Sequence, residues 1–172
     1  MNPIEEHKLS QLLEIIAHAP ALRIAHFSEE GEQLVRILSQ FCTKNNYEYQ
    51  LNITQPSFFE TMKEQYQENP LVQCMHFNLT RPRYMMQGKV YDYLFITIPI
   101  EASMQSDFLQ KVHGIIKNAG LILIFIPKGD TTQRYSWMTL FEEHYFVASS
   151  TIDDLFEHYD VLISKKMHGW GG

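Results

Sequence analysis

Residues 91–127, YDYLFITIPIEASMQSDFLQKVHGIIKNAGLILIFIP, decide the fold of this 172-residue chain. They begin with an apolar run, Tyr91–Ile98, that is typical of a buried β-strand. Gly120 is then placed to cap a helix whose apolar residues recur at helical spacing: Phe108, Leu109, Val112, Ile115 and Ile116. Leu121–Ile126 is the most apolar run of all, so we expect a strand at the sheet centre, covered on both faces. Strand, helix and strand in this order predict a parallel β-α-β unit.

The same alternation extends to both sides of this unit. Toward the N-terminus the sequence predicts three helices: the first is stopped by Pro20, the second is capped by Ser28 and the third begins at Pro56. It also predicts strands in residues 21–27, 47–54 and 72–79. Toward the C-terminus it predicts a helix in residues 132–144 and strands in residues 146–151 and 160–164. Only about eight residues separate these last strands, fewer than the dozen or more that a parallel crossover needs, so they should pair antiparallel.

The fold class that follows is α/β. We expect a doubly wound, mostly parallel seven-stranded sheet with a C-terminal antiparallel hairpin, in a three-layer α/β/α sandwich. No repeat or linker interrupts the pattern, so residues 1–172 should form a single domain. An N-terminal helix falls within residues 1–20 and a tail covers residues 165–172. The sequence indicates no role for the part of that tail from His168 to Gly172.

The composition favours some partners and disfavours others. Lys and Arg number 14 against 20 Asp and Glu, a net charge of -6, whereas nucleic-acid-binding domains usually carry the opposite balance. We therefore expect no nucleic-acid partner and interpret Arg81–Arg83 and Lys165–Lys166 as solvated surface. No apolar run is long enough to cross a membrane, and the first residues do not resemble a signal peptide. We expect a cytoplasmic protein with free thiols at Cys42 and Cys74, and the histidine spacing predicts no metal site.

From about Leu9 to Ser164, the layout resembles the class I methyltransferases that use S-adenosylmethionine (SAM). Residues 91–96 are similar to the family's fourth strand, which commonly begins with Tyr-Asp or Phe-Asp. Residues 108–120 resemble the helix that ends in Leu-Lys-Pro-Gly-Gly, and residues 121–127 resemble the fifth strand. The two closing strands correspond to the sixth and seventh. The resemblance implies a methyltransferase-like domain with SAM as its cofactor.

The glycine-rich turn of that family is not retained. In the family, the first strand runs into Leu-Asp-x-Gly-x-Gly-x-Gly, where bare backbone lets the ligand approach closely. The matching residues 22–29 are LRIAHFSE. Arg23 stands where the acidic residue is expected, and the glycine positions hold Ala25, Phe27 and Glu29. We expect the Phe27 ring to take up space that a ligand would need, which makes this a degenerate cofactor motif.

Other positions of the family's cofactor site are altered as well. The second strand ends in residues 52–54, NIT, without the carboxylate that binds the ribose hydroxyls. Asn78 matches an Asp that meets the adenine, and Thr97 opens residues 97–100, TIPI, where amino-methylating members carry Asn/Asp-Pro-Pro-Tyr/Phe. No catalytic residue is identified. The candidate cofactor-binding residues that the resemblance implies are His26, Phe27, Ser28, Asn52, Asn78 and Thr97.

Two features beside these candidates bear on binding. Glu29 and Glu30 are expected in the first turn of a helix, where carboxylates meet the positive end of the helix dipole and oppose an anionic ligand. His26 should end the first strand, at the edge where open α/β sheets bind ligands. A hydrogen-bonded histidine with no catalytic task is the simpler interpretation of His26, and a ligand contact is the alternative.

Two functions stay open at this point. One is a divergent methyltransferase that binds SAM in an altered pocket, which the layout of the whole chain favours. The other is a non-catalytic binding or assembly module on the same fold, which associates with a second copy or with a protein partner. The lost glycines and the lost ribose carboxylate favour the absence of a cofactor, and so favour the second function.

Overall fold

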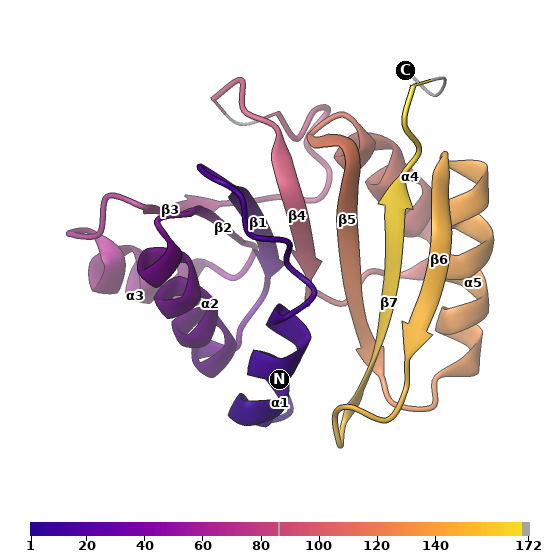
Figure 1. Cartoon of the computed structure of the whole chain (residues 1–172), viewed down its shortest axis with the longest axis horizontal. Coiled ribbons are helices and arrows are strands. Elements are labelled where there is room, and N and C mark those ends of the chain that lie inside the picture. The colour runs from indigo at the N-terminus through magenta and orange to yellow at the C-terminus, as the bar shows by residue number, and fades with distance from the viewer. Residues whose placement is uncertain (86, 170–172) are drawn as a thin grey trace.

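The computed structural model describes residues 1–85 and 87–169, which build a seven-stranded sheet in the order β3-β2-β1-β4-β5-β7-β6 (Figure 1). Strands β1 to β5 run parallel, whereas β7 runs antiparallel to both β5 and β6. The strands are β1 (Arg23–Ser28), β2 (Glu48–Ile53), β3 (Val72–His76), β4 (Tyr91–Ile96), β5 (Ile116–Pro127), β6 (Phe146–Ile152) and β7 (Tyr159–Lys166). The predicted α/β class with a C-terminal antiparallel hairpin is confirmed.

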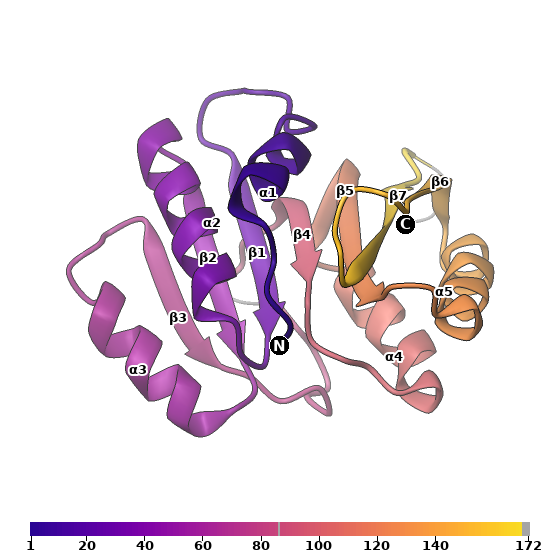
Figure 2. The same cartoon turned by 90° about the horizontal axis from the view of Figure 1, so that it is seen from below.

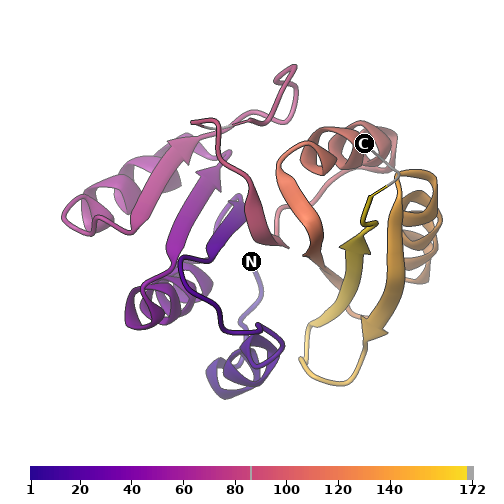
Figure 3. The same ribbon diagram turned by 45° about the horizontal axis from the view of Figure 1, so that its top comes forward.

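Helices cover both faces of this sheet. On one face, α1, α2 and α3 bury apolar side chains against the strands, and on the other face α4 and α5 do so. In Figure 3 the indigo helix α1 and the orange helices α4 and α5 lie on opposite sides of the sheet. The helices are α1 (Glu6–Leu13), α2 (Glu32–Asn45), α3 (Pro56–Tyr66), α4 (Ala102–His113) and α5 (Thr131–Glu143).

The apolar run in β5 serves both cores. Leu123 and Phe125 pack in the core under α1 to α3, whereas Ile122, Ile124 and Ile126 pack in the core under α4 and α5. A strand that is buried on both faces needs apolar residues at every position, which explains the unbroken run. β5 lies between β4 and β7, one place from the middle strand, β4.

The order of the strands reverses between β1 and β4. From β1 the chain proceeds outward to β2 and β3, and then returns to place β4 on the other side of β1. At such a switch point the connections leave the carboxyl ends of the two strands in opposite directions, and ligands of open α/β sheets bind in the crevice between them. Figure 2 looks onto this edge, where the N-terminus lies beside the tip of β1. A ligand site is therefore expected at the carboxyl ends of β1 and β4.

The helix of the central β-α-β unit ends earlier than its apolar spacing predicts. α4 ends at His113, and β5 already begins at Ile116, which pairs with Tyr91. The prediction that Gly120 caps this helix is therefore wrong. Gly120 lies in β5, where a Cβ atom would come within 2.9 Å of the Lys117 carbonyl oxygen and 3.0 Å of the Asp92 carbonyl oxygen. Close backbone packing, and not a helix cap, requires glycine here.

The start of α2 also differs from the prediction. Its first residue is Glu32, and its N-cap residue is Gly31, whose φ of 110° lies in the left-handed region that favours glycine. Ser28 ends β1 and does not cap the helix, because its hydroxyl donates to the Glu30 carbonyl oxygen. Glu29 and Glu30 precede the helix, so the prediction that they form its first turn is wrong.

Strand β7 extends into the segment that the sequence predicts as a tail. Lys165 is exposed, as predicted, but Lys166 is buried, and its amine donates to the carbonyl oxygens of His113 and Ile116 at 2.8 and 3.1 Å. The interpretation of Lys166 as solvated surface is therefore wrong. Of the segment from His168 to Gly172, residues 170–172 lie outside the described residues.

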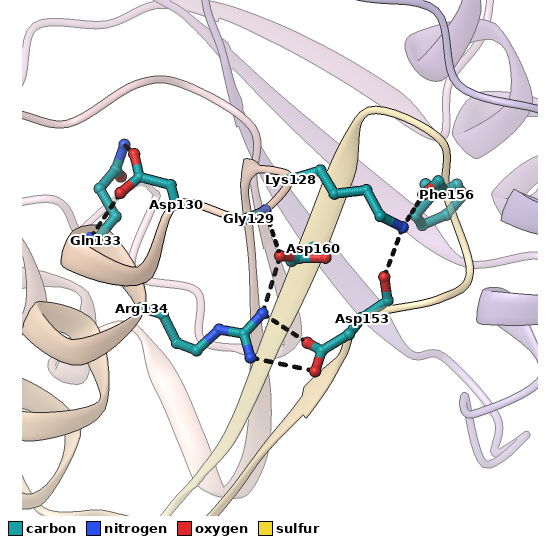
Figure 4. Close-up of polar contacts among 8 residues, drawn as sticks. All are labelled: Lys128, Gly129, Asp130, Gln133, Arg134, Asp153, Phe156 and Asp160. Atoms are coloured by element: carbon teal, nitrogen blue, oxygen red, sulfur yellow. Dashed lines mark hydrogen bonds and ion pairs between the residues drawn. The ribbon is translucent and has the colours of Figure 1, made fainter.

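A charged network joins the β6–β7 hairpin to the start of α5 (Figure 4). Arg134 in α5 pairs with Asp153 and with Asp160, each at a closest N···O distance of 2.9 Å. Asp160 in β7 is only 2% exposed and also accepts a hydrogen bond from the Gly129 N–H. Lys128 donates two further hydrogen bonds to backbone carbonyls of the hairpin. These contacts fix the loop after β5 against β7.

Candidate functional site

Two adjoining cavities open at the carboxyl ends of the strands. The Asn78 groove, of about 530 Å³, lies over the ends of β2 and β3 and is lined by Thr54, His76, Asn78, Thr80 and Met104. The Trp137 cavity, of about 420 Å³, lies over the ends of β4 and β5 and is lined by Thr97, Ile100, Phe125, Gln133, Trp137 and Tyr159. Three residues line both of them: Glu29, Ile98 and Pro99. Both volumes fall in the range of small-molecule sites.

The six candidate residues do not come together at this edge. Asn78 lines the groove, and Thr97 lines the cavity. The other four have 0% exposure and lie on neither wall: His26, Phe27, Ser28 and Asn52. That these six residues bind a cofactor stays a prediction.

The Phe27 ring is fully buried and lines neither of the two cavities. It packs edge-to-face against Phe77, with ring centroids 5.0 Å apart, and against Phe108 at 5.6 Å. Tyr84 completes this aromatic cluster, which belongs to the core under α4. The side chain of Phe27 points from β1 into that core, and its contact Phe77 lines the Asn78 groove. That the Phe27 ring takes up space that a ligand would need stays a prediction.

His26 lies below the cavity and contacts two hydroxyl groups. Its Nδ1 lies 2.6 Å from the Tyr49 hydroxyl, and its Nε2 lies 2.8 Å from the Thr97 hydroxyl. Burial lowers the pKa of His26 to about 3, so the imidazole is neutral near pH 7. Burial also raises the pKa of Tyr49 well above its ordinary value, so that hydroxyl keeps its proton.

The hydrogen bonds that join Tyr49, His26 and Thr97 form a relay, and only one direction along it gives every donor an acceptor. Tyr49 is fully buried, and its hydroxyl has no other partner among the described residues, so it should donate to Nδ1 of His26. Nε2 of His26 then carries the hydrogen and donates to Thr97. The Thr97 hydroxyl in turn donates to the Phe27 carbonyl oxygen at 3.3 Å. The Thr97 hydroxyl is therefore engaged both as an acceptor from His26 and as a donor to the Phe27 carbonyl oxygen.

Asn52 lies beside Phe27 and away from both cavities. The two residues are register partners on β2 and β1, and the Asn52 side-chain oxygen accepts a hydrogen bond from Gln50. Its Nδ2 is buried and has no partner in residues 1–85 and 87–169. The family resemblance implies a place for Asn52 at the ribose, whereas at the strand ends it is Thr54 that lines the groove.

The backbone after β1 is covered by the chain itself. A Cβ atom on Gly31, the glycine nearest the degenerate motif, would lie 2.6 Å from the Met1 sulfur. The Met1 amino group pairs with Glu30. On the far side of the groove, the side-chain oxygen of Asn78 accepts hydrogen bonds from the Thr80 N–H and hydroxyl. The backbone at Gly31, the Glu30 carboxylate and the Asn78 side chain are therefore already in contact with other parts of the chain.

Several residues of this edge are missed by reasoning from the sequence. The spacing identifies Trp137 only as part of an apolar helix face, and Tyr49 only as part of an alternating strand. Ile98 and Pro99 stand out only as a departure from the family's motif. The sequence carries one usable signal, the proline that follows a buried strand at the switch point, because a chain that leaves the sheet there must line the crevice.

Two other kinds of site are absent from the described part of the chain. In residues 1–85 and 87–169, no three His, Cys, Asp or Glu side chains lie close enough together to hold a metal ion. None of the described helices has the length and apolar character needed to cross a membrane.

Comparisons with known proteins find similarity in structure but not in sequence. No family model matches the chain, and no curated protein matches it. Among solved structures, the CurJ carbon methyltransferase superposes with a TM-score of 0.70 and 13% identity over 92% of this chain and 52% of that one. A methyltransferase from Pyrococcus furiosus gives 0.69 and 13% over 94% of this chain and 83% of that one.

A third similar structure is the N-methyltransferase NodS from Bradyrhizobium japonicum. It has a TM-score of 0.67 and 7% identity, over 94% of this chain and 93% of NodS. This chain spans about half the length of the CurJ and DszA carbon methyltransferases. At such low identity the similarities concern the fold alone. The chain therefore has the α/β fold of the methyltransferases, with its seven-stranded sheet and C-terminal hairpin.

Proposed function

We propose that this chain is a divergent methyltransferase-like protein that no longer holds SAM in the manner of the family and binds a different small molecule at the same edge. The proposal rests on one observation: cavities open at the carboxyl ends of the strands, but the polar groups expected there for SAM are changed. Both cavities are present, yet the groups that should meet a nucleoside are replaced or already engaged.

The residues present do not fit SAM. The cofactor's methionine end needs exposed backbone after β1, and there the Met1 side chain lies against Gly31. The ribose needs a carboxylate at the end of β2, and the groove has the neutral Thr54 instead. The adenine amino group needs a free acceptor after β3, whereas the Asn78 oxygen already accepts two hydrogen bonds. A hydrogen-bonding site that loses its matched groups commonly loses affinity by orders of magnitude.

Calorimetric titration with SAM and with S-adenosylhomocysteine tests this proposal. We expect no saturable heat at ligand concentrations up to about 1 mM, because each lost polar contact is worth about tenfold in affinity. Saturable binding of either compound with a dissociation constant in the micromolar range would contradict the proposal. The thermal unfolding midpoint, measured with the same ligands, gives an independent readout, since a bound ligand raises it.

A second candidate is the assembly module. β6 is an edge strand, and around its start Tyr145 and Val147 are 54% and 36% exposed, which is unusual for large apolar side chains beside an open edge. A bulge between Val147 and Ser150 works against strand pairing, so contact through side chains is the form we propose. Light scattering should then give twice the chain mass of 20.2 kDa, and Val147→Lys should return it to 20.2 kDa. A mass of 20.2 kDa at every concentration would remove this candidate.

A further inference from the structure

The first five residues of the chain form part of the carboxyl edge of the sheet. They precede α1 and belong to neither a helix nor a strand. Figure 2 shows this segment running from α1 to the tip of β1. Met1 and Asn2 line the Trp137 cavity. We call residues 1–5 the N-terminal strap, and because it supplies part of the cavity wall, any movement of the strap changes the cavity.

The strap is attached on one side to the β6–β7 hairpin. The Tyr159 hydroxyl at the start of β7 donates to the Asn2 carbonyl oxygen at 3.0 Å. The Glu157 N–H in the hairpin loop donates to Oε1 of Glu5, also at 3.0 Å. Both bonds are exposed, so water can replace either partner, and each contributes little to holding the strap closed.

On its other side the strap meets the turn between β1 and α2. The Met1 side chain lies against Gly31, where a Cβ atom would come within 2.6 Å of the Met1 sulfur. Between the two ends of the strap, Ile4 is 3% exposed and packs in the core under α1 to α3. The strap therefore spans the crevice between the hairpin and the turn, with Ile4 as its buried anchor.

No backbone ladder holds the strap in place. Residues 1–4 make no backbone-to-backbone hydrogen bond in the described part of the chain. Lifting the strap breaks the two exposed hydrogen bonds and the Met1–Glu30 ion pair, and takes one apolar side chain out of the core. Every strand pair stays intact. Segments with so few contacts open locally without unfolding the domain.

We propose that the N-terminal strap is an autoinhibitory gate over the Trp137 cavity. In the closed position Met1 and Asn2 occupy part of the crevice, so a ligand that extends toward Gly31 must displace them. When Ile4 leaves the core, the strap lifts as one unit from Met1 to Glu5 and the cavity opens. Ligand and strap therefore compete, and a bound ligand shifts the strap toward the open position. The inference describes the regulation of the small-molecule site proposed above, and it rests on that function.

A matched pair of variants opens the strap or leaves it closed. Ile4→Asp places a carboxylate at the buried anchor, and burying an unpaired charge is so costly that the strap should stay lifted. Pro3→Asp adds the same charge at the neighbouring exposed position and keeps Ile4. Tyr159→Phe weakens the closed position from the other side, because it removes the hydroxyl that donates to Asn2.

Hydrogen exchange of the Glu157 amide reports whether the strap is closed, because that N–H is bonded to Glu5. We expect exchange at least about tenfold faster in Ile4→Asp than in Pro3→Asp, since lifting the strap exposes the N–H to water. In Tyr159→Phe the rate should rise about fivefold, the effect of one lost hydrogen bond. Equal rates in the two aspartate variants would overturn the inference, as would an unchanged rate in Tyr159→Phe.

Solvent access to the cavity is the second readout. A neutral paramagnetic agent in solution speeds the relaxation of methyl groups near solvent, and Ile98 and Ile100 line the cavity with exposures of only 6% and 5%. We expect both methyl groups to relax faster in Ile4→Asp than in Pro3→Asp. Ile24, which is fully buried, should relax alike in both variants. If Ile98 and Ile100 also relax alike, the strap is not a gate.

Titration of Ile4→Asp with S-adenosylhomocysteine separates this inference from the proposed function. We expect no saturable amide shifts at Thr54 and Asn78 up to about 1 mM, because an open strap restores neither the ribose carboxylate nor a free adenine acceptor. Saturable shifts there would contradict the proposed function and leave the gate intact. Equal exchange rates at Glu157, without such shifts, would overturn the gate alone.

Discussion

At the residue scale, His26 illustrates how a polar side chain can lie inside this core. It is fully buried, and both of its ring nitrogens contact a hydroxyl, one from β2 and one from the end of β4. The relay ties three neighbouring strands together and fixes the orientation of Thr97. The simpler interpretation of this histidine, a hydrogen-bonded side chain without a catalytic task, agrees with a pKa that burial lowers to about 3.

A pH dependence of stability follows from this burial. The folded pKa of about 3 lies below the ordinary 6.5, so the unfolded chain takes up a proton first. The contribution of His26 to the free energy of unfolding is therefore fully present above pH 6.5 and is lost as the pH falls toward 3, at about 1.4 kcal/mol per pH unit. We expect urea unfolding at pH 7, 6 and 5 to show this loss, and His26→Gln to reduce it.

The glutamine side chain in that variant would keep hydrogen bonds to both hydroxyls but could not take up a proton. The matched control is His7→Gln, which changes an exposed histidine and should leave the pH dependence as it is. If His26→Gln and the unmodified chain lose stability in parallel between pH 7 and pH 5, then His26 does not cause this pH dependence and the account of a buried, neutral His26 is wrong.

At the scale of elements, Gly120 determines how β5 begins. Because a Cβ atom there would meet two backbone oxygens at 2.9 and 3.0 Å, Gly120→Ala should force the strand to shift. We expect a loss of about 1–3 kcal/mol in the free energy of unfolding, the usual result of overpacking. Gly114→Ala is the control, because its φ of -72° suits alanine and its Cβ would meet only an oxygen at 3.4 Å. Similar losses in both variants would refute the steric account.

The charged network at the β6–β7 hairpin gives a second test at this scale. Asp160 is 2% exposed and accepts hydrogen bonds from Arg134 and from the Gly129 N–H, so Asp160→Ala should cost about 1–3 kcal/mol of stability. The side chain of Asp153 is 42% exposed, and Asp153→Ala should cost less than about 1 kcal/mol. Chemical unfolding of both variants measures the difference. If the two variants lose the same free energy of unfolding, or if Asp153→Ala loses more, burial does not determine how strongly these contacts stabilise the fold.

At the scale of the whole molecule, the sequence predicts the fold much better than the site. Apolar runs such as Leu121–Ile126 and the short spacing before β7 are sufficient for the element order and for the antiparallel hairpin. The same apolar spacing fails at the end of α4, because Ile115 and Ile116 suit a helix face and a strand equally well. Only the pairing of Ile116 with Tyr91 distinguishes the two.

The site depends on where each strand ends, which the sequence does not determine to within one residue. β1 ends at Ser28, one residue later than predicted, and so buries His26 and Phe27 in the sheet. β4 ends at Ile96, two residues earlier than predicted, and so places Thr97 at the cavity. Shifts of this size decide whether a polar side chain meets a ligand or the core.

We propose that a nucleoside no longer finds its contacts at the carboxyl edge of this methyltransferase-like fold. The most direct measurement is an amide spectrum of the isotope-labelled chain titrated with S-adenosylhomocysteine. We expect the peaks of Glu29, Thr54 and Asn78 to stay in place up to about 1 mM, since the matched hydrogen-bonding groups are absent or engaged. Saturating shifts at these three residues would contradict the claim.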